Sequence, residues 1–112
     1  MGLIKYNYTS KSLGVTLPNA YAVLNEIVLK GNNCRAIFVI QKDRNSTTSL
    51  KPVDKVEISF VWDRKTDLAK MAYEKAKTQK IKTYDYEKIN EQGYPQEIET
   101  DGVLNGWLND FV

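Results

Sequence analysis

Three segments of the chain place apolar side chains with the two-residue period of a β-strand. They are residues 20–29, 34–40 and 56–62, and in the third every even-numbered position carries Val, Ile, Phe or Trp. A fourth segment, 68–77, places its apolar side chains at the spacing of an amphipathic helix. This order predicts an α+β fold, in which a small antiparallel β-sheet of three or more strands packs against one α-helix.

A compact turn signal separates the first two of these strands. Residues 31–33 read Gly-Asn-Asn, and both residue types tolerate the positive φ that tight hairpin turns need. The sequence therefore predicts a β-hairpin. Its second strand is apolar on both faces, with Phe38 on one and Val39 on the other, and this predicts a central strand.

The N-terminal part of the chain gives three further expectations. Residues 3–8 carry alternating apolar and aromatic side chains and are expected to form an edge strand. Pro18 has no N–H to donate to a sheet, so the next strand should begin after it. In that strand the odd-numbered side chains, such as Tyr21 and Ile27, are expected to face the core.

Polar residues mark the ends of the predicted helix. Thr66 is expected to be its N-cap, and the carboxylate of Asp67 suits the positive end of the helix dipole. The polar stretch 41–52 is expected to be an exposed loop. Beyond the helix, residues 81–86 are expected to form a short strand, and 88–100, which contain one Gly and one Pro, a linker or an arm.

The C-terminal residues 103–112 place apolar side chains at helical spacing, although Gly102 and Gly106 would each weaken such a helix by roughly 1 kcal/mol. Two interpretations stay open. The segment folds back on the sheet, or it docks as an amphipathic helix into a groove of a neighbouring subunit. In the second case, deleting residues 101–112 impairs assembly and leaves the sheet folded. The candidate partner-binding residues are Leu104, Trp107, Leu108 and Phe111.

Charge is distributed unevenly along a chain whose net charge is only +2. Residues 64–82 hold seven Lys or Arg and two acids, whereas residues 83–112 hold seven acids and one Lys. The acidic part either lies over the basic helix or forms a separate interaction face. We therefore divide the chain into a core domain, 1–82, and an acidic C-terminal arm, 83–112, that ends in the amphipathic segment.

Residues that commonly carry catalysis are scarce. The chain has no histidine and a single cysteine, Cys34, which lies in a strand pattern and is expected to be a small core residue. Glu97, Glu99 and Asp101 could offer oxygen ligands to a cation, but a solvated acidic stretch is favoured because their spacing is not that of an EF-hand. We therefore expect no enzymatic activity, no catalytic residue, no cofactor and no metal site.

Nucleic acid and membranes are disfavoured as partners. Lysines beside Tyr73 on the predicted helix could contact phosphates, but a solvated helix face is the simpler interpretation, and the acidic C-terminal arm would repel nucleic acid. The apolar runs are far shorter than the roughly 20 residues that a transmembrane helix needs.

Three short motifs lie in the body of the chain: residues 17–23 read Leu-Pro-Asn-Ala-Tyr-Ala-Val, residues 58–62 read Ile-Ser-Phe-Val-Trp, and residues 72–74 read Ala-Tyr-Glu. In these motifs and their order the chain resembles a family of small structural proteins encoded in the tail modules of phages and prophages of Gram-positive bacteria. The resemblance covers roughly residues 15–80. The long acidic C-terminal arm departs from the family pattern.

The resemblance implies a non-enzymatic component of the tail tip or baseplate. Such a protein would be made in the cytoplasm of the bacterial host, enter the virion tail, and bind other virion proteins or copies of itself as a homo-oligomer. The alternative function is a phage-encoded accessory protein that binds a host factor, as an inhibitor or a nucleic-acid mimic. The acidic C-terminal arm motivates this alternative.

Overall fold

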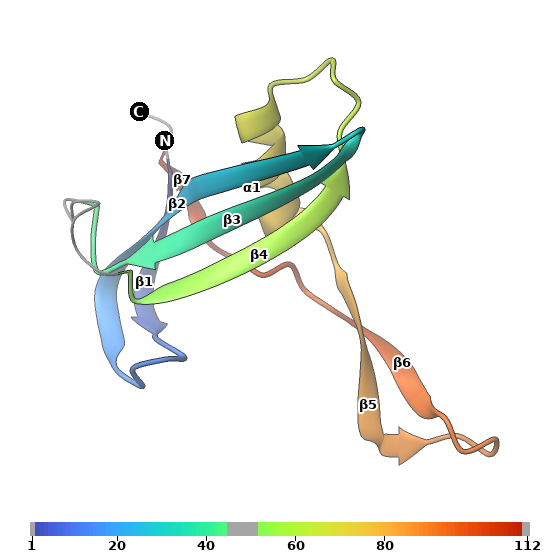
Figure 1. Ribbon diagram of the computed structural model, residues 1–112. Coiled ribbons are helices and arrows are strands. Elements are labelled where there is room, and N and C mark those ends of the chain that lie inside the picture. Colours follow the sequence, from blue (N-terminus) through green and yellow to red (C-terminus); the bar gives the residue numbers. More distant parts are fainter. Residues whose placement is uncertain (1, 45–51, 111–112) are drawn as a thin grey trace.

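The computed structural model describes residues 2–44 and 52–110, which form seven strands and one helix (Figure 1). In chain order the elements are β1 (Gly2–Thr9), β2 (Thr16–Lys30), β3 (Asn33–Gln41), β4 (Asp54–Val61), α1 (Leu68–Thr78), β5 (Ile81–Ile89), β6 (Pro95–Thr100) and β7 (Leu108–Asp110). Five strands form one antiparallel sheet in the order β4-β3-β2-β1-β7. Strands β5 and β6 form a separate antiparallel pair.

The predicted α+β class is wrong, because the described residues are mainly β-strand and α1 has only 11 residues. The difference arises in the C-terminal third, where segments expected to be a linker and a helix form β6 and β7. Their partners are β5 and β1, and strand pairing depends on such neighbours more than on local propensity. The strands predicted at 20–29, 34–40 and 56–62 and the helix predicted at 68–77 are confirmed as β2, β3, β4 and α1.

A bulge in β2 changes which of its side chains face the core. The first part of β2 pairs with β1 and the second with β3, and the β3 register shifts between Leu24 and Glu26. Before this bulge the even-numbered Ala20 and Ala22 belong to the buried cluster, whereas after it the odd-numbered Ile27 packs against that cluster. The prediction that odd-numbered side chains face the core is therefore wrong before the bulge.

Two predictions about the N-terminal strands are also wrong. Strand β1 is not an edge strand, because β7 pairs with its other side. Strand β2 begins at Thr16, and the register places Pro18 opposite Asn7, whose φ is +56°. Proline is tolerated at this point because pairing of β2 with β3 starts only at Tyr21. On that side, therefore, no neighbouring strand requires an N–H donor from position 18.

The predicted hairpin and the predicted central strand are confirmed. Gly31 and Asn32 join β2 to β3, and Gly31 has the positive φ, +62°, that the turn requires. Strand β3 lies between β2 and β4, with Phe38 buried on one face and Val39 on the other. Part of the predicted loop at 41–52, residues 45–51, lies outside the described residues.

The N-cap of α1 is Asp67, and the prediction of Thr66 as the cap is wrong. The Asp67 carboxylate accepts a hydrogen bond from the Lys70 N–H at 3.1 Å. Thr66 is engaged elsewhere, since its N–H and hydroxyl both donate to the Asp63 carboxylate. Thr66 and Asp67 can both cap a helix. Asp67 becomes the cap because Thr66 is held by its hydrogen bonds to Asp63.

Helix α1 covers one face of the five-stranded sheet through small and aromatic side chains. Ala72, Tyr73 and Ala76 are buried, and the Tyr73 ring meets Phe38 of β3 edge to face at 5.2 Å. The Tyr73 hydroxyl accepts a hydrogen bond from the Leu24 N–H at 2.8 Å, close to the bulge in β2. We call the sheet face under α1 the inner face.

Residues 101–110 return along α1 to the sheet and do not form the predicted helix. The Leu104 N–H donates to the Ala76 carbonyl at 2.9 Å, and Gly106 adopts φ +83° before β7 pairs with β1. Leu104 and Trp107 are buried in the core cluster. The helix prediction fails because these residues take their hydrogen bonds and packing from distant parts of the chain.

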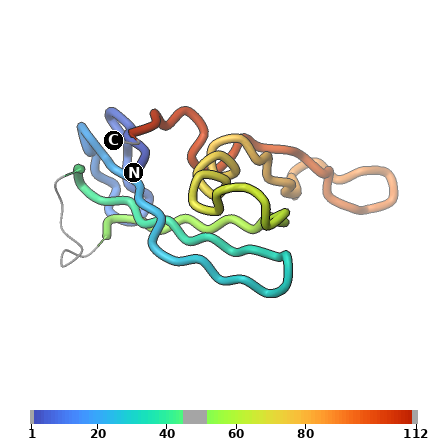
Figure 2. Tube along the Cα trace, turned by 90° about the horizontal axis from the view of Figure 1, so that it is seen from above, coloured from blue at the N-terminus to red at the C-terminus, as the bar shows by residue number. Residues whose placement is uncertain are grey.

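The β5–β6 pair projects away from the rest of the molecule. Figures 1 and 2 both show it directed away from the five-stranded sheet, beyond the C-terminal end of α1. Its strands pair from Ile81 with Thr100 outward, with an irregularity between Asp85 and Ile89. We call residues 81–100 the projecting hairpin. The proposed boundary between residues 82 and 83 falls inside β5.

Candidate interaction surface

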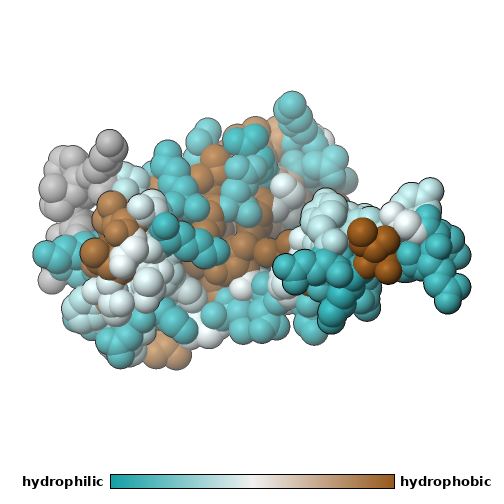
Figure 3. All heavy atoms as spheres, turned by 90° about the horizontal axis from the view of Figure 1, so that it is seen from below, coloured by the Kyte–Doolittle hydropathy of each residue, from teal (hydrophilic) through white to brown (hydrophobic). Residues whose placement is uncertain are grey.

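The projecting hairpin exposes large apolar and aromatic side chains that a core would normally cover. They are between 38% and 75% exposed, and Figure 3 shows hydrophobic groups among hydrophilic ones on this projection. Exposed apolar groups gathered on one element are typical of interaction sites. These side chains belong to Ile81, Tyr84, Tyr86, Ile89 and Tyr94.

One face of the projecting hairpin combines an aromatic ring with carboxylates. Tyr84 pairs directly with Glu97, and Lys82 pairs directly with Glu99. Side chains of directly paired residues and of residues two apart lie on the same face, so these four side chains form one surface. The Lys82 Nζ lies 3.7 Å from the Glu97 Oε1, an ion pair between exposed groups. We call this surface the Tyr84 face.

The projecting hairpin is acidic, while the rest of the chain is basic. It carries five acids, Asp85, Glu87, Glu91, Glu97 and Glu99, against two lysines, which gives a net charge of −3. Because the whole chain carries +2, the remaining residues carry +5. The fold therefore separates the acidic residues of the projecting hairpin from the basic residues of the body, and the projecting hairpin forms a face of its own.

The sheet has a shallow pocket on the face opposite α1. It has a volume of about 400 Å³ and lies near the turn between β2 and β3. Cys34 and Phe60 at its base belong to the core, so the side chains that alternate with them point to the outer face. We call this the outer pocket; its outward-facing residues are Val28, Lys30, Asn33, Arg35, Ser59 and Val61.

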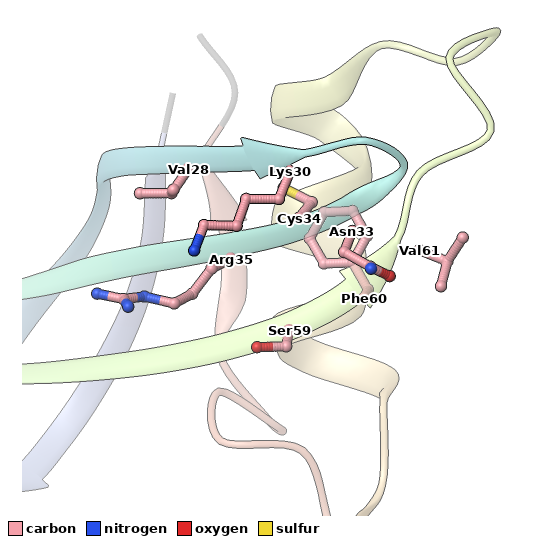
Figure 4. A pocket seen from close by; sticks show the side chains of 8 residues that line it. All are labelled: Val28, Lys30, Asn33, Cys34, Arg35, Ser59, Phe60 and Val61. Atoms are coloured by element: carbon pink, nitrogen blue, oxygen red, sulfur yellow. The ribbon is translucent and has the colours of Figure 1, made fainter.

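Strand register groups the outer-pocket side chains into two neighbouring rows. Val28, Arg35 and Ser59 form one row across three strands, and Lys30, Asn33 and Val61 form the next. Figure 4 shows Lys30 and Arg35 extending from neighbouring strands. The Arg35 Nε lies 2.7 Å from the Glu57 Oε1, and both side chains are about half exposed. The outer pocket thus offers valine methyl groups beside two cations.

The four residues predicted to bind a partner do not form one surface. Leu104 is fully buried and Trp107 is 4% exposed, with the Trp107 ring 5.3 Å from that of Tyr8. Leu108 is 54% exposed in β7, and Phe111 lies outside the described residues. The sequence left two interpretations open for this segment. For Leu104 and Trp107 the structure agrees with the first, because both pack on the sheet of their own chain.

A hydrogen-bonded cluster around the partly buried Asp54 carboxylate ties the β1–β2 connection to the start of β4. Asp54 accepts hydrogen bonds from the Tyr8 hydroxyl, from the Lys11 N–H at 3.2 Å and from the Ser12 N–H at 3.1 Å. Burial alone would raise the pKa of Asp54, but these hydrogen bonds outweigh it and hold the pKa below its usual value. The pKa of Tyr8 is raised, mainly by burial and to a smaller extent by the hydrogen bond that its hydroxyl donates to Asp54. This cluster joins strands and has a structural role.

The remaining chemical groups give no further candidate site. Burial raises the pKa of the Cys34 thiol, which keeps it protonated at neutral pH. Within residues 2–44 and 52–110, His, Cys, Asp and Glu side chains do not gather in threes that could hold a metal. In the same ranges, α1 is too short and too polar to cross a bilayer.

The sequence contained a weak signal for the outer pocket. Val61 interrupts the polar side of the alternation in β4, where Lys55, Glu57 and Ser59 precede it, and it is 68% exposed. The residues that join it come from β2 and β3, so only strand pairing brings the set together. Comparison with protein-family models, curated proteins and solved structures finds no match to this chain.

Proposed function

We propose that this chain is a non-enzymatic structural protein of a bacteriophage tail that works through protein–protein contacts. The observation that carries the proposal is the projecting hairpin with its exposed tyrosines. A two-stranded hairpin alone is marginally stable in water, and its exposed aromatic groups add little to its own stability. Tyrosine is enriched among the residues that dominate binding at protein interfaces. A partner that covers these side chains would explain both why the hairpin projects from the body and why its tyrosines are exposed.

The resemblance to tail-module proteins supports the location in the virion. The residues that carry it lie in the body of the molecule, in the first part of β2, in β4 and in α1. The projecting hairpin, 81–100, lies outside the matched range of roughly 15–80. In this proposal the body supplies a common scaffold and the projecting hairpin supplies the contact that places it.

The test is the protein composition of purified particles. A phage, or an induced prophage, that encodes the chain is purified on a density gradient, and its proteins are quantified by mass spectrometry. We expect the chain at a fixed ratio to the other tail proteins. A chain that is abundant in the infected cell and missing from the particles would contradict the proposal and favour a host-directed accessory protein.

A paired variant tests the role of the projecting hairpin in that placement. Replacing Tyr84 and Tyr86 by Ser removes two exposed rings from the projecting hairpin. Replacing Tyr6 by Ser removes a ring of β1 that is exposed to a similar degree and serves as the control. We expect the hairpin variant to be depleted from particles about tenfold or more, since hot-spot tyrosines often contribute more than 1.4 kcal/mol. Equal incorporation of both variants would remove the projecting hairpin from the proposal.

A further inference from the structure

We propose that the partner of the projecting hairpin is a second copy of this chain, and that the Tyr84 face docks on the outer pocket of that copy. The inference rests on the proposed function in one respect, namely that the hairpin binds a protein. It adds the identity of that protein and the surface that receives the hairpin.

Charge complementarity supports a second copy as the partner. The Tyr84 face carries two carboxylates, Glu97 and Glu99, against the single cation Lys82, and the outer pocket carries Lys30 and Arg35. More broadly, the projecting hairpin has a net charge of −3, and the rest of the chain has +5. Two copies therefore attract each other hairpin to body, whereas hairpin to hairpin and body to body repel.

The apolar groups on the two surfaces also match. The Tyr84 ring is about half exposed and lies opposite Glu97, and the lining of the outer pocket combines Val28 and Val61 with its two cations. An aromatic ring that enters a pocket lined by aliphatic groups, with paired charges at the rim, is the usual arrangement of a binding hot spot. The pocket volume of about 400 Å³ falls in the range of natural binding pockets.

The ion pairs already present on each surface do not block docking. Lys82 with Glu97 and Arg35 with Glu57 are pairs of largely exposed side chains, at 3.7 Å and 2.7 Å. Exposed pairs contribute about 1 kcal/mol or less, so they can rearrange when a partner arrives.

The direction of the projecting hairpin requires that docking occurs between chains. Figures 1 and 2 show it pointing away from the sheet that carries the outer pocket. Each copy then offers one hairpin and one outer pocket, so the contact joins two different surfaces. Repeated contacts of this kind produce closed rings or filaments.

Sedimentation equilibrium and light scattering of the purified chain test this directly. We expect association that strengthens with protein concentration in 50 mM salt and weakens in 500 mM salt. A chain that stays monomeric at high concentration in low salt would overturn the inference. The same chain could still be found in particles at a fixed ratio, so failure here leaves the proposed function standing.

A charge-exchange experiment tests the two surfaces together. One variant carries Glu97→Lys and Glu99→Lys, and the other carries Lys30→Glu and Arg35→Glu. Each variant alone should lose association about tenfold or more, because its hairpin and pocket then carry the same sign. An equimolar mixture should associate again, since each hairpin meets a pocket of opposite sign. Variants that associate alone like the wild type, or a mixture that stays monomeric, would overturn the inference.

A neutral pair of variants separates docking from folding. Val61→Ser should weaken association, whereas Val15→Ser, at an exposed position in the β1–β2 connection, should not. Circular dichroism and thermal unfolding establish that both variants are folded. Equal association of these two variants would exclude the outer pocket as the docking surface.

Discussion

Gly102 lies where the C-terminal segment passes the end of α1. A Cβ at this position would lie 2.7 Å from the Lys77 carbonyl oxygen and 2.9 Å from that of Ala76. Both are backbone atoms, so neither can move away without distorting the helix. The sequence suggested only that this glycine weakens a helix. Its role in the fold is to let two backbones approach closely.

Replacing Gly102 by Ala should therefore destabilise the protein. We expect a loss of about 1–3 kcal/mol in the free energy of unfolding, as for other substitutions that overpack a tight contact. Asp101→Ala, at the exposed neighbouring position, should stay within about 0.5 kcal/mol of the wild type. Urea unfolding followed by tryptophan fluorescence measures both. Equal stability of the two variants would show that the C-terminal segment does not approach α1 this closely.

Asp54 should make stability depend on pH in the acid range. Its pKa in the folded state is lowered, so its contribution is present above the unfolded value of about 3.9 and is lost as the pH falls through the folded value. Asp54→Asn should lower the free energy of unfolding by about 1–3 kcal/mol at pH 7. The difference in free energy of unfolding between this variant and the wild type should become smaller toward pH 2.

The matched control for this prediction is Asp101→Asn, which changes an exposed carboxylate in the same way. Denaturation curves from pH 2 to pH 7 should separate only the Asp54 variant from the wild type. If the difference in free energy of unfolding stayed constant from pH 2 to pH 7, the charge of Asp54 would not contribute to stability. The effect of the substitution would then come from packing alone.

At the scale of elements, the C-terminal segment is part of the core. The interpretation in which residues 101–112 dock on a neighbour predicted that their deletion leaves the sheet folded. The full burial of Leu104 now predicts the opposite, because deletion would remove Leu104 and Trp107 from the core cluster. Leu104→Ala should lower stability by about 2–5 kcal/mol. Leu108→Ala, at an exposed site in β7, should change it by about 0.5 kcal/mol or less.

The projecting hairpin should be dispensable for folding. Ile81 and Thr100 are paired at its base, so the chain enters and leaves it about 5 Å apart. Replacing residues 82–99 by a short Gly-Ser linker should preserve the circular dichroism of the sheet and change the free energy of unfolding by about 1 kcal/mol or less. A large loss of stability would show that the hairpin supports the core, and would argue against its role as a free contact element.

At the scale of the whole molecule, the projecting hairpin makes the protein elongated. The radius of gyration is 16.0 Å, whereas a compact chain of this length is expected to have about 13 Å. Small-angle X-ray scattering of the monomer in high salt should give a value clearly above 13 Å. The variant without residues 82–99 should approach the compact value. Equal values for both proteins would mean that the hairpin folds against the body in solution.

Local pattern and tertiary pairing contributed to different parts of this fold. Alternation predicted β2, β3 and β4, the Gly31 turn predicted their hairpin, and helical spacing predicted α1, because each of these signals is contained within a few neighbouring residues. For the candidate site, the sequence supplied the acidic C-terminal arm. It also suggested a C-terminal helix, whose residues Leu104 and Trp107 the structure places in the core.

The amino-acid sequence by itself determined that the segments of β2, β3 and β4 are extended and that of α1 is helical, because periodicity and turn chemistry are local properties. Only the tertiary structure decided which strands are neighbours, where the β2 bulge exchanges the two faces, and that residues 81–100 stand apart as a hairpin. It also brought Lys30, Arg35 and Val61, from three different strands, to the lining of one pocket. Such choices depend on hydrogen bonds and contacts between residues far apart in the chain, and no local pattern records them.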